Sequence, residues 1–279
     1  MQKTITALLL CLFGLSLSAQ QIEYKILEDN PDKIYSGFVA AGIGLTFNKQ
    51  YNAMPLAINS RYGMGSIQLE GALNYDLYKL EGEGTTFLIE AGGFLAMSNS
   101  TSSKDVKIVT DYNPYADYNA ATGERTETIT FFLAPATVAI ERGVRGGVYY
   151  QKSGAEGQGF SGTTFVNLGG VYVGFQQIAK AYVNTLVNDK VERSASAFTK
   201  WYVDVMLLPV SSIADETLNF DTSKDGLIGW RAGIQLFGNA HEGAKGFFRR
   251  IIYSADLGSR PISGFNYTFT ATYPLKSFK

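Results

Sequence analysis

Cysteine and histidine are nearly absent from this chain of 279 residues, which contains one of each, Cys11 and His241. Cys11 lies in a segment that we expect to be removed on export, so the mature chain would have no disulfide and no thiol chemistry. A single imidazole leaves little for a metal site built on histidine ligands. The formal net charge of −1 gives no indication of a nucleic-acid partner.

Long apolar runs are missing beyond the N-terminus. A transmembrane helix needs about 18 or more mostly apolar residues, so a polytopic helical membrane protein is excluded. The composition points to β structure instead: 30 glycines, 17 tyrosines and 18 phenylalanines, with only 18% charged residues and a mean hydropathy of −0.01. Aromatic and β-branched side chains fit a pleated surface, and glycine exceeds its usual share of about 7%.

The first residues read MQKTITALLLCLFGLSLSAQ. Lys3 supplies a charged start, an apolar run extends from Ile5 to Leu17, and the small residue Ala19 precedes Gln20. This three-part pattern predicts a cleaved secretory signal peptide, and the run is too short for a membrane anchor. We therefore expect three segments: a signal peptide at 1–19, a periplasmic lead-in at 20–34 and an outer-membrane β-barrel at 35–279.

Alternation of apolar and polar residues with period two predicts amphipathic strands. It is clearest between Phe265 and Leu275 and recurs in 67–78, 228–237 and 250–258. Soluble strands usually stop at about five or six residues, whereas these apolar faces suit the 9–11 residues of a tilted membrane strand. Because every backbone group must pair in lipid, the strands must close. The predicted fold is all-β, a transmembrane antiparallel up-and-down β-barrel.

The pattern predicts about twelve strands, within a range of ten to fourteen. They are placed at 35–47, 55–62, 65–78, 85–98, 105–112, 126–142, 144–152, 162–183, 196–209, 226–238, 247–258 and 264–276. With both termini in the periplasm, the links predicted to be extracellular are 48–54, 79–84, 113–125, 153–161, 210–225 and 259–263. The links predicted to be periplasmic are 63–64, 99–104, around 143, 184–195 and 239–246. The two longest links, 113–125 and 210–225, then lie outside, as in known barrels.

The signal peptide with its Ser-Ala-Gln ending, the strand pattern and the final strand together resemble the outer-membrane β-barrel proteins of Bacteroidota. The resemblance spans nearly the whole chain and implies a location in the cell outer membrane. It rests on pattern, and no subfamily motif is present. The C-terminus departs from the proteobacterial insertion signal, which ends in an aromatic residue, because Lys279 is last.

Catalysis is not expected. Enzymes among the known outer-membrane barrels are expected to use a histidine near the membrane edge. The single histidine here, His241, lies in a turn flanked by glycine, on the predicted periplasmic side. Asp221 to Gly226 looks like the opening of a calcium loop, but Ala232 stands where a bidentate glutamate should close it. We expect no enzyme activity, no cofactor and no metal.

Charged residues on the inward face are the most informative feature. The predicted lumen-lining residues are Glu70, Asp76, Glu90, Glu141, Arg145, Lys180, Asp204, Arg231, Arg250 and Asp256. A charge inside a narrow barrel is costly unless it is paired. One interpretation is a network of ion pairs that plugs the lumen, and the other is a pore lining that selects small polar or charged solutes.

Two functional hypotheses follow. The first is a structural or accessory barrel in an envelope complex of secretion or assembly type, with a plugged lumen. The second is a narrow channel for small polar or charged solutes. The segment 111–119, rich in tyrosine and aspartate, offers either a contact surface in an extracellular loop or an ordinary solvated loop. The expected partners are outer-membrane lipid and envelope proteins bound through the extracellular loops.

Overall fold

The computed structural model describes residues 22–48, 52–81, 86–119, 124–155, 164–213, 227–238, 240, 250–261 and 264–278. These residues are almost entirely β-strand. The elements, in chain order, are β1 (Tyr24–Asp29), η1 (Pro31–Lys33), β2 (Gly37–Asn48), β3 (Asn52–Met64), β4 (Ile67–Glu81), β5 (Phe87–Asn119), β6 (Glu124–Ala155), β7 (Thr164–Val187), β8 (Val191–Ile213), β9 (Ile228–Gly238), β10 (Ile252–Arg260) and β11 (Gly264–Phe278). The predicted all-β class is confirmed.

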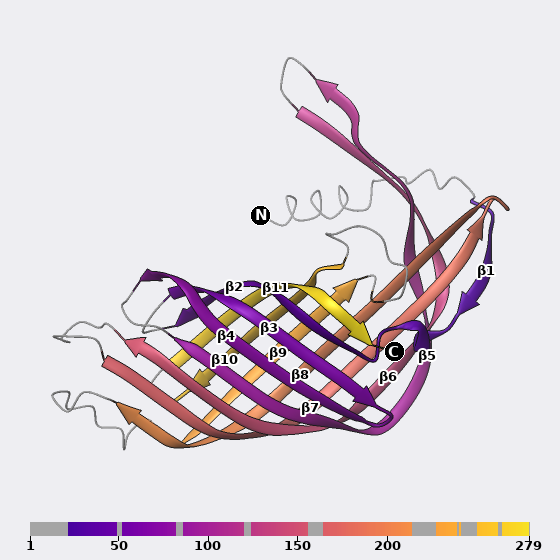
Figure 1. Ribbon diagram of the computed structural model, residues 1–279. Helices are drawn as coiled ribbons and strands as arrows, with labels where there is room; N and C mark the ends of the chain where they lie inside the picture. The colour runs from indigo at the N-terminus through magenta and orange to yellow at the C-terminus, as the bar shows by residue number, and fades with distance from the viewer. Residues whose placement is uncertain are drawn as a thin grey trace, which may run out of the picture.

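Strands β2 to β11 form a closed antiparallel barrel (Figure 1). Each strand pairs with its neighbours in sequence, and β2 closes the barrel by pairing with β11. The predicted up-and-down connectivity is therefore confirmed. β1 is an additional strand, which pairs with β7 outside the barrel. We call the end where β2 begins and β11 finishes the terminal end, and the opposite end the loop end.

The barrel has ten strands and not the expected twelve. β5 runs without a break through both predicted strands 85–98 and 105–112, and β6 runs through 126–142 and 144–152. The polar residues 99–104 were interpreted as a turn, but they pair with β6. They are polar because most of them are exposed to solvent beyond the barrel wall. The glycines around Gly143 likewise lie within a strand, where the backbones of β5 and β6 approach closely.

This correction moves one predicted link to the other end of the molecule. The segment 113–125 was expected among the extracellular loops, but it contains the end of β5 and the start of β6, which lie beyond the terminal end of the barrel. The predicted turns at 99–104 and around 143 do not exist. Each of the remaining links lies at the end of the barrel where we expected it.

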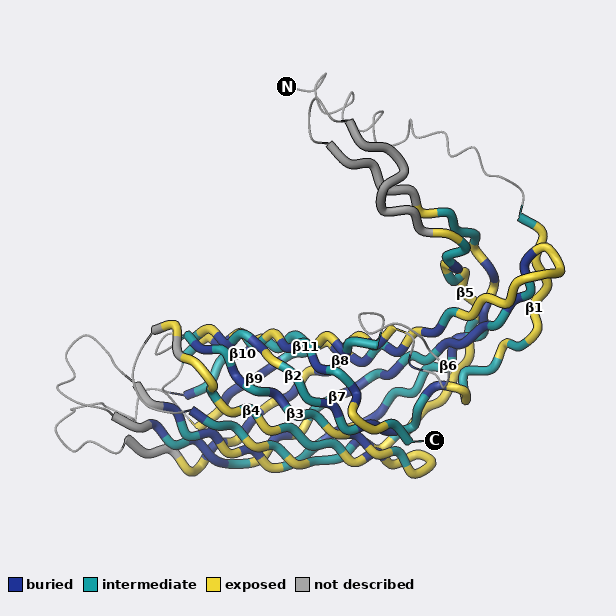
Figure 2. The backbone as a smooth tube through the Cα atoms, turned by 45° about the horizontal axis from the view of Figure 1, so that its top comes forward, coloured by how far each residue is buried: buried dark blue, intermediate teal, exposed yellow. Residues whose placement is uncertain are grey.

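β5 and β6 continue beyond the barrel as a two-stranded ribbon, which we call the arm (β5 from Ser98, β6 up to Arg142). In Figure 2 the arm leaves the terminal end and bends away from the barrel axis. β7 and β8 also extend there and are joined by a turn in which Asn188 and Asp189 have positive φ, a conformation that Asn and Asp tolerate. A small core of Ile108, Ala134, Ala136 and Val183 connects the arm to β7.

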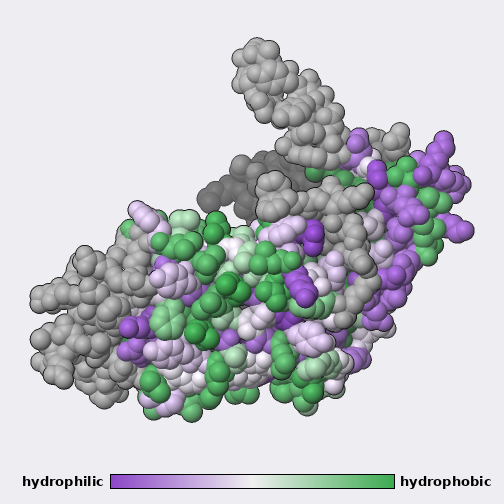
Figure 3. Space-filling view, viewed as in Figure 1, coloured by the Kyte–Doolittle hydropathy of each residue, from purple (hydrophilic) through white to green (hydrophobic). Residues whose placement is uncertain are grey.

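The barrel presents apolar side chains outward and polar side chains inward. In β11, Phe265, Tyr267 and Phe269 are 43%, 52% and 45% exposed, whereas the intervening Asn266 and Thr270 are 3% and 5% exposed. Figure 3 shows apolar side chains spread over the barrel wall and hydrophilic ones gathered around β1 and the base of the arm. Within the described residues, no helix is long and apolar enough to cross a membrane.

Candidate functional site

Inside the barrel, an apolar layer and a charged layer lie one above the other. At the terminal end, aromatic and aliphatic side chains from opposite walls meet in a cluster that we call the apolar plug. It consists of Ile34, Phe38, Ala40, Phe94, Ile178, Tyr182, Phe198, Phe237, Ala240 and Ile252. Phe38 and Phe237 pack edge to face with ring centroids 6.0 Å apart. The plug is therefore a continuous apolar layer across one end of the barrel.

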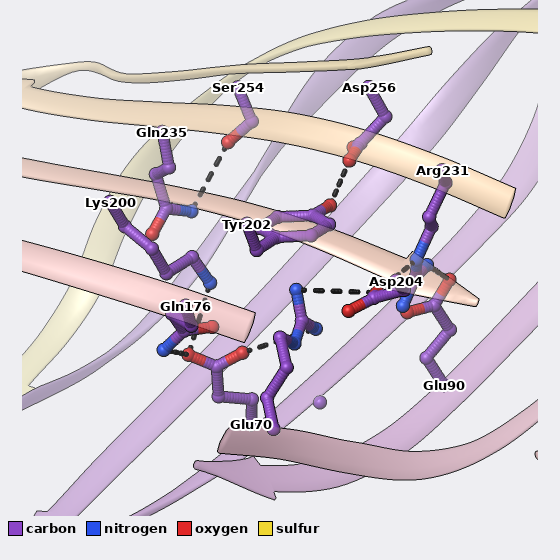
Figure 4. A network of polar contacts seen from close by, with 12 residues as sticks. Glu70, Glu90, Gln176, Lys200, Tyr202, Asp204, Arg231, Gln235, Ser254 and Asp256 are labelled. Carbon is purple, nitrogen blue, oxygen red and sulfur yellow. Dashed lines mark hydrogen bonds and ion pairs between the residues drawn. The ribbon is translucent and has the colours of Figure 1, made fainter. Parts of the chain in front are cut away.

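Above the plug, six charged side chains alternate in sign, and we call them the charge chain. Its order is Lys200, Glu70, Arg145, Asp204, Arg231, Glu90. Lys200 Nζ lies 3.1 Å from Glu70 Oε1, and Arg145 Nη2 lies 3.5 Å from Glu70 Oε2. Arg145 Nη1 lies 3.7 Å from Asp204 Oδ2, which also accepts a hydrogen bond of 2.7 Å from Arg231 Nε. Arg231 Nη1 pairs with Glu90 (Figure 4).

Two tyrosine rings fill the space around these charges. The Arg145 guanidinium carbon lies 3.8 Å from the ring centroid of Tyr202, and that of Arg231 lies 4.5 Å from the ring of Tyr172. Such cation–π contacts gain strength when the cation is withdrawn from water. The Tyr202 hydroxyl donates to Asp256 on β10 (Figure 4). The rings thus replace solvent between the arginines and link the charge chain to β10.

The charge chain is electrically balanced. No side chain in it is more than 12% exposed, and removing such groups from water costs several kcal/mol per ion unless partners compensate. Here three cations face three carboxylates, and Gln176 Nε2 donates a further hydrogen bond of 3.2 Å to Glu70. The arrangement neutralises buried charge across the barrel and ties β4, β5, β6, β8 and β9 together. It is a structural device of the kind that a closed lumen requires.

A cavity of about 90 Å³ remains beside the charge chain. At about 10–15 Å³ per water molecule, it has room for a handful of waters. Several buried polar atoms of its lining residues have no hydrogen-bond partner among the described residues, including Arg145 Nε, Arg231 Nη2 and Gln235 Oε1. No cluster of three or more metal-ligating side chains occurs in that part of the chain. The cavity is a small space with a largely polar lining inside a packed lumen.

The structure brings most of the predicted lumen-lining residues together. Glu70, Glu90, Arg145, Asp204 and Arg231 belong to the charge chain, and Asp256 is joined to it through Tyr202. A separate pair links Lys180 Nζ to Glu141 at 2.5 Å, with Gln68 donating to the same carboxylate at 2.8 Å.

Two of the predicted residues lie elsewhere. Asp76 lines a second, smaller cavity toward the loop end, together with Thr86, Gln151 and Arg260. Arg250 stands apart from the charge chain, just before β10, with its guanidinium carbon 5.4 Å from the ring centroid of Tyr273. Neither residue takes part in the balanced network.

Sequence reasoning missed Lys200, Tyr202, Tyr172 and Arg61. Lys200 and Tyr202 share the inward face of β8 with Asp204 at intervals of two residues, so the alternation contains the signal that would have found them. Arg61 lies on β3, within the expected strand 55–62, but its inward position was not recognised. Tyr172 gives no such signal, because a tyrosine is as common on the outer face of this barrel as in its lumen.

Several predicted features lie outside the described residues: the signal peptide, His241, and Asp221 to Gly226 with the rest of the 214–226 loop. The backbone of 112–119 is described within β5, but its side chains are not. Comparison with protein-family models, with curated proteins and with solved structures found no match.

Proposed function

We propose that this protein is an outer-membrane β-barrel with a closed lumen, which serves a structural or accessory role in an envelope complex of secretion or assembly type. The outward apolar face supports insertion in a bilayer. On β4 the outward positions from Ile67 to Leu77 are apolar or glycine over eleven residues, near the length that a tilted spanning strand needs. The predicted signal peptide and the resemblance to Bacteroidota barrels agree with this location.

The observation that best supports the proposal of a closed lumen is the apolar plug beneath a neutral charge chain. Ions cross a pore only where water or polar groups replace their hydration shell, and the plug offers a layer of phenylalanine and isoleucine side chains instead. Rings of one charge sign select ions in many charged pores, whereas the charge chain is balanced. The second candidate, a narrow channel for small polar or charged solutes, rests on the cavity beside the charge chain.

The arm supports the accessory role. From Leu95, the last residue of β5 paired with β4, to Asn119 there are 24 residues, which at about 3.3 Å each extend about 80 Å. A two-stranded ribbon is marginally stable alone in water, and beyond the core at Ile108 and Ala134 the arm has no further core cluster among the described residues. We propose that the arm, and not an extracellular loop, is the partner-binding element.

Single-channel conductance of the refolded protein in a planar bilayer tests the closed lumen. We expect no steady conductance from the unaltered protein. The double variant Phe198→Ala with Phe237→Ala opens the plug and should give steady conductance, which shows that the assay detects an open barrel. Conductance from the unaltered protein at the level of the double variant would contradict the closed lumen and favour the channel.

The accessory role is tested by removing the arm. Residues 105–135 are replaced by a two-residue turn, which preserves every pairing within the barrel. After gentle extraction from native membranes, the unaltered protein should migrate in a complex larger than the barrel, and the shortened protein should migrate as a barrel alone. Equal migration of both proteins would contradict the role assigned to the arm.

A further inference from the structure

The edge of β5 that faces away from β6 is open in the arm. β4 pairs with β5 only as far as Leu95, and the Ala96 amide then donates a last hydrogen bond to the carbonyl oxygen of Ser66 at the barrel rim. From Ser98 to Val109, β5 pairs with β6 on one side, and no other strand pairs with this stretch among the described residues. An open edge presents unpaired amide and carbonyl groups, which are a template for another strand.

The open stretch is regular and long. Natural edge strands are protected by short length, bulges, proline or charged side chains. The register with β6 shifts only at the two ends of the stretch from Ser98 to Val109, whose sequence SNSTSSKDVKIV contains no proline and no glycine. The edge of β6 differs, because at the base of the arm its Thr137 amide is bound by the Asp29 side chain of β1. Only charge therefore guards the edge of β5.

The charges on this stretch are complementary to themselves. Asp105 and Lys107 are both exposed and are two residues apart, so they lie on one face of the strand. Lys107 identifies that face, because its Nζ lies 3.8 Å from the ring centroid of Phe131 on β6. If two identical strands pair antiparallel about a two-fold axis at Val106, Asp105 of each copy stands opposite Lys107 of the other, which is a stabilising cross-strand arrangement. An axis at Lys104, Asp105 or Lys107 would instead set like charges opposite each other.

We propose that two copies of this protein pair through the open edges of β5, antiparallel about a two-fold axis at Val106, so that the two arms form one continuous sheet. The proposal rests on the arm as the partner-binding element, and it identifies the partner as a second copy. Each residue from Ser103 to Val109 would face a residue of the other copy. The described part of the arm runs across the barrel axis (Figure 2), as the strands must if a two-fold axis along the membrane normal relates two barrels in one bilayer. The pairing supplies backbone partners to a ribbon that is marginally stable alone.

Charge reversal tests the pairing by sedimentation velocity of the purified full-length protein in detergent micelles. The unaltered protein should be a dimer. Asp105→Lys and Lys107→Asp each set like charges opposite each other twice, and each should raise the dissociation constant of the dimer by about tenfold or more. An equimolar mixture of these two variants should dimerise again, because lysines of one copy then face aspartates of the other. The double variant Asp105→Lys with Lys107→Asp should also dimerise.

Lys25→Asp is the matched control, since it changes the net charge as Lys107→Asp does, at an exposed position on β1, and it should leave the dimer intact. The proposal is overturned if the unaltered protein is monomeric, if the single variants dimerise as well as the unaltered protein, or if their mixture stays monomeric. A monomeric purified protein that migrates in a larger complex from native membranes would show that the arm binds a different envelope protein, so the proposed function would stand without this inference. A purified dimer, together with a native complex that does not change when the arm is removed, would support the pairing and contradict the role of the arm in an envelope complex.

Discussion

Asp204 and Arg231 stand directly opposite each other on β8 and β9 and are joined inside the barrel by a hydrogen bond of 2.7 Å between Arg231 Nε and Asp204 Oδ2. The aspartate side chain is fully buried and that of the arginine is 5% exposed. Because Asp204 also faces Arg145, this carboxylate lies between two guanidinium groups at the centre of the charge chain. Its removal should therefore have a larger effect than the loss of a single contact.

Asp204→Ala leaves two buried guanidinium groups short of a counterion. Breaking a buried ion pair from one side costs about 3–5 kcal/mol, and we expect a loss of that size in the free energy of unfolding by urea in detergent micelles. Glu28→Gln is the matched control, since the Lys33–Glu28 pair, 3.1 Å long, is exposed and should contribute about 0–1 kcal/mol. Similar losses for both variants would contradict the structural importance of the charge chain.

The only two tryptophans of the chain report directly on membrane insertion. Trp201 and Trp230 both lie on the outward face, 38% and 41% exposed. In vesicles of brominated phospholipid their fluorescence should be quenched strongly, because the bromine atoms contact side chains that face the acyl region. Trp201→Phe, which leaves Trp230, should be quenched as well. Fluorescence that is equal in brominated and ordinary lipid would mean that the outward face does not contact acyl chains.

The sequence predicted the features that depend on the local alternation of polar and apolar residues. Period-two patterning identified the inward and outward faces, the up-and-down order of strands and the inward position of Asp204 and Arg231. The alternation of polar and apolar residues failed as a guide at Ser98–Ser103, which lie beyond the barrel wall. Both faces of the strand are polar there, so the segment looks like a turn. Which charges meet across the lumen, such as Glu70 with Lys200, depends on register and closure of the barrel, and neither is encoded within one strand.

Two adjacent glycines on β6 provide a test of packing around the arginines. A Cβ atom added at Gly147, on the inward face, would lie 2.4 Å from the Ala91 carbonyl oxygen and 2.7 Å from the Tyr172 hydroxyl, whereas one added at Gly146 would have its nearest neighbour at 3.1 Å. Gly147→Ala should therefore displace Tyr172 from the guanidinium of Arg231 and destabilise the barrel by about 1–3 kcal/mol. Gly146→Ala should cost clearly less in the same urea unfolding measurement. A larger loss for Gly146→Ala would contradict the assigned faces of β6.

The attachment of the arm depends on one carboxylate. Where β6 leaves β7, the Asp29 side chain at the end of β1 accepts hydrogen bonds from the Thr137 amide at 2.8 and 3.0 Å and from its hydroxyl at 2.7 Å. These bonds satisfy a backbone donor that lies just beyond the last β6–β7 pair, Val138 with Ala181. Asp29→Ala removes all of them and should loosen the base of the arm, while the barrel pairings remain intact.

Hydrogen exchange followed by mass spectrometry distinguishes the two regions. In Asp29→Ala, peptides that cover 129–138 should exchange faster than in the unaltered protein, and peptides from β9 and β10 should exchange at unchanged rates, because local opening need not involve the whole fold. Lys25→Ala, an exposed change on the same strand β1, should leave both regions unchanged. Unaltered exchange in 129–138 would show that the core at Ile108, Ala134 and Val183 holds the arm without Asp29.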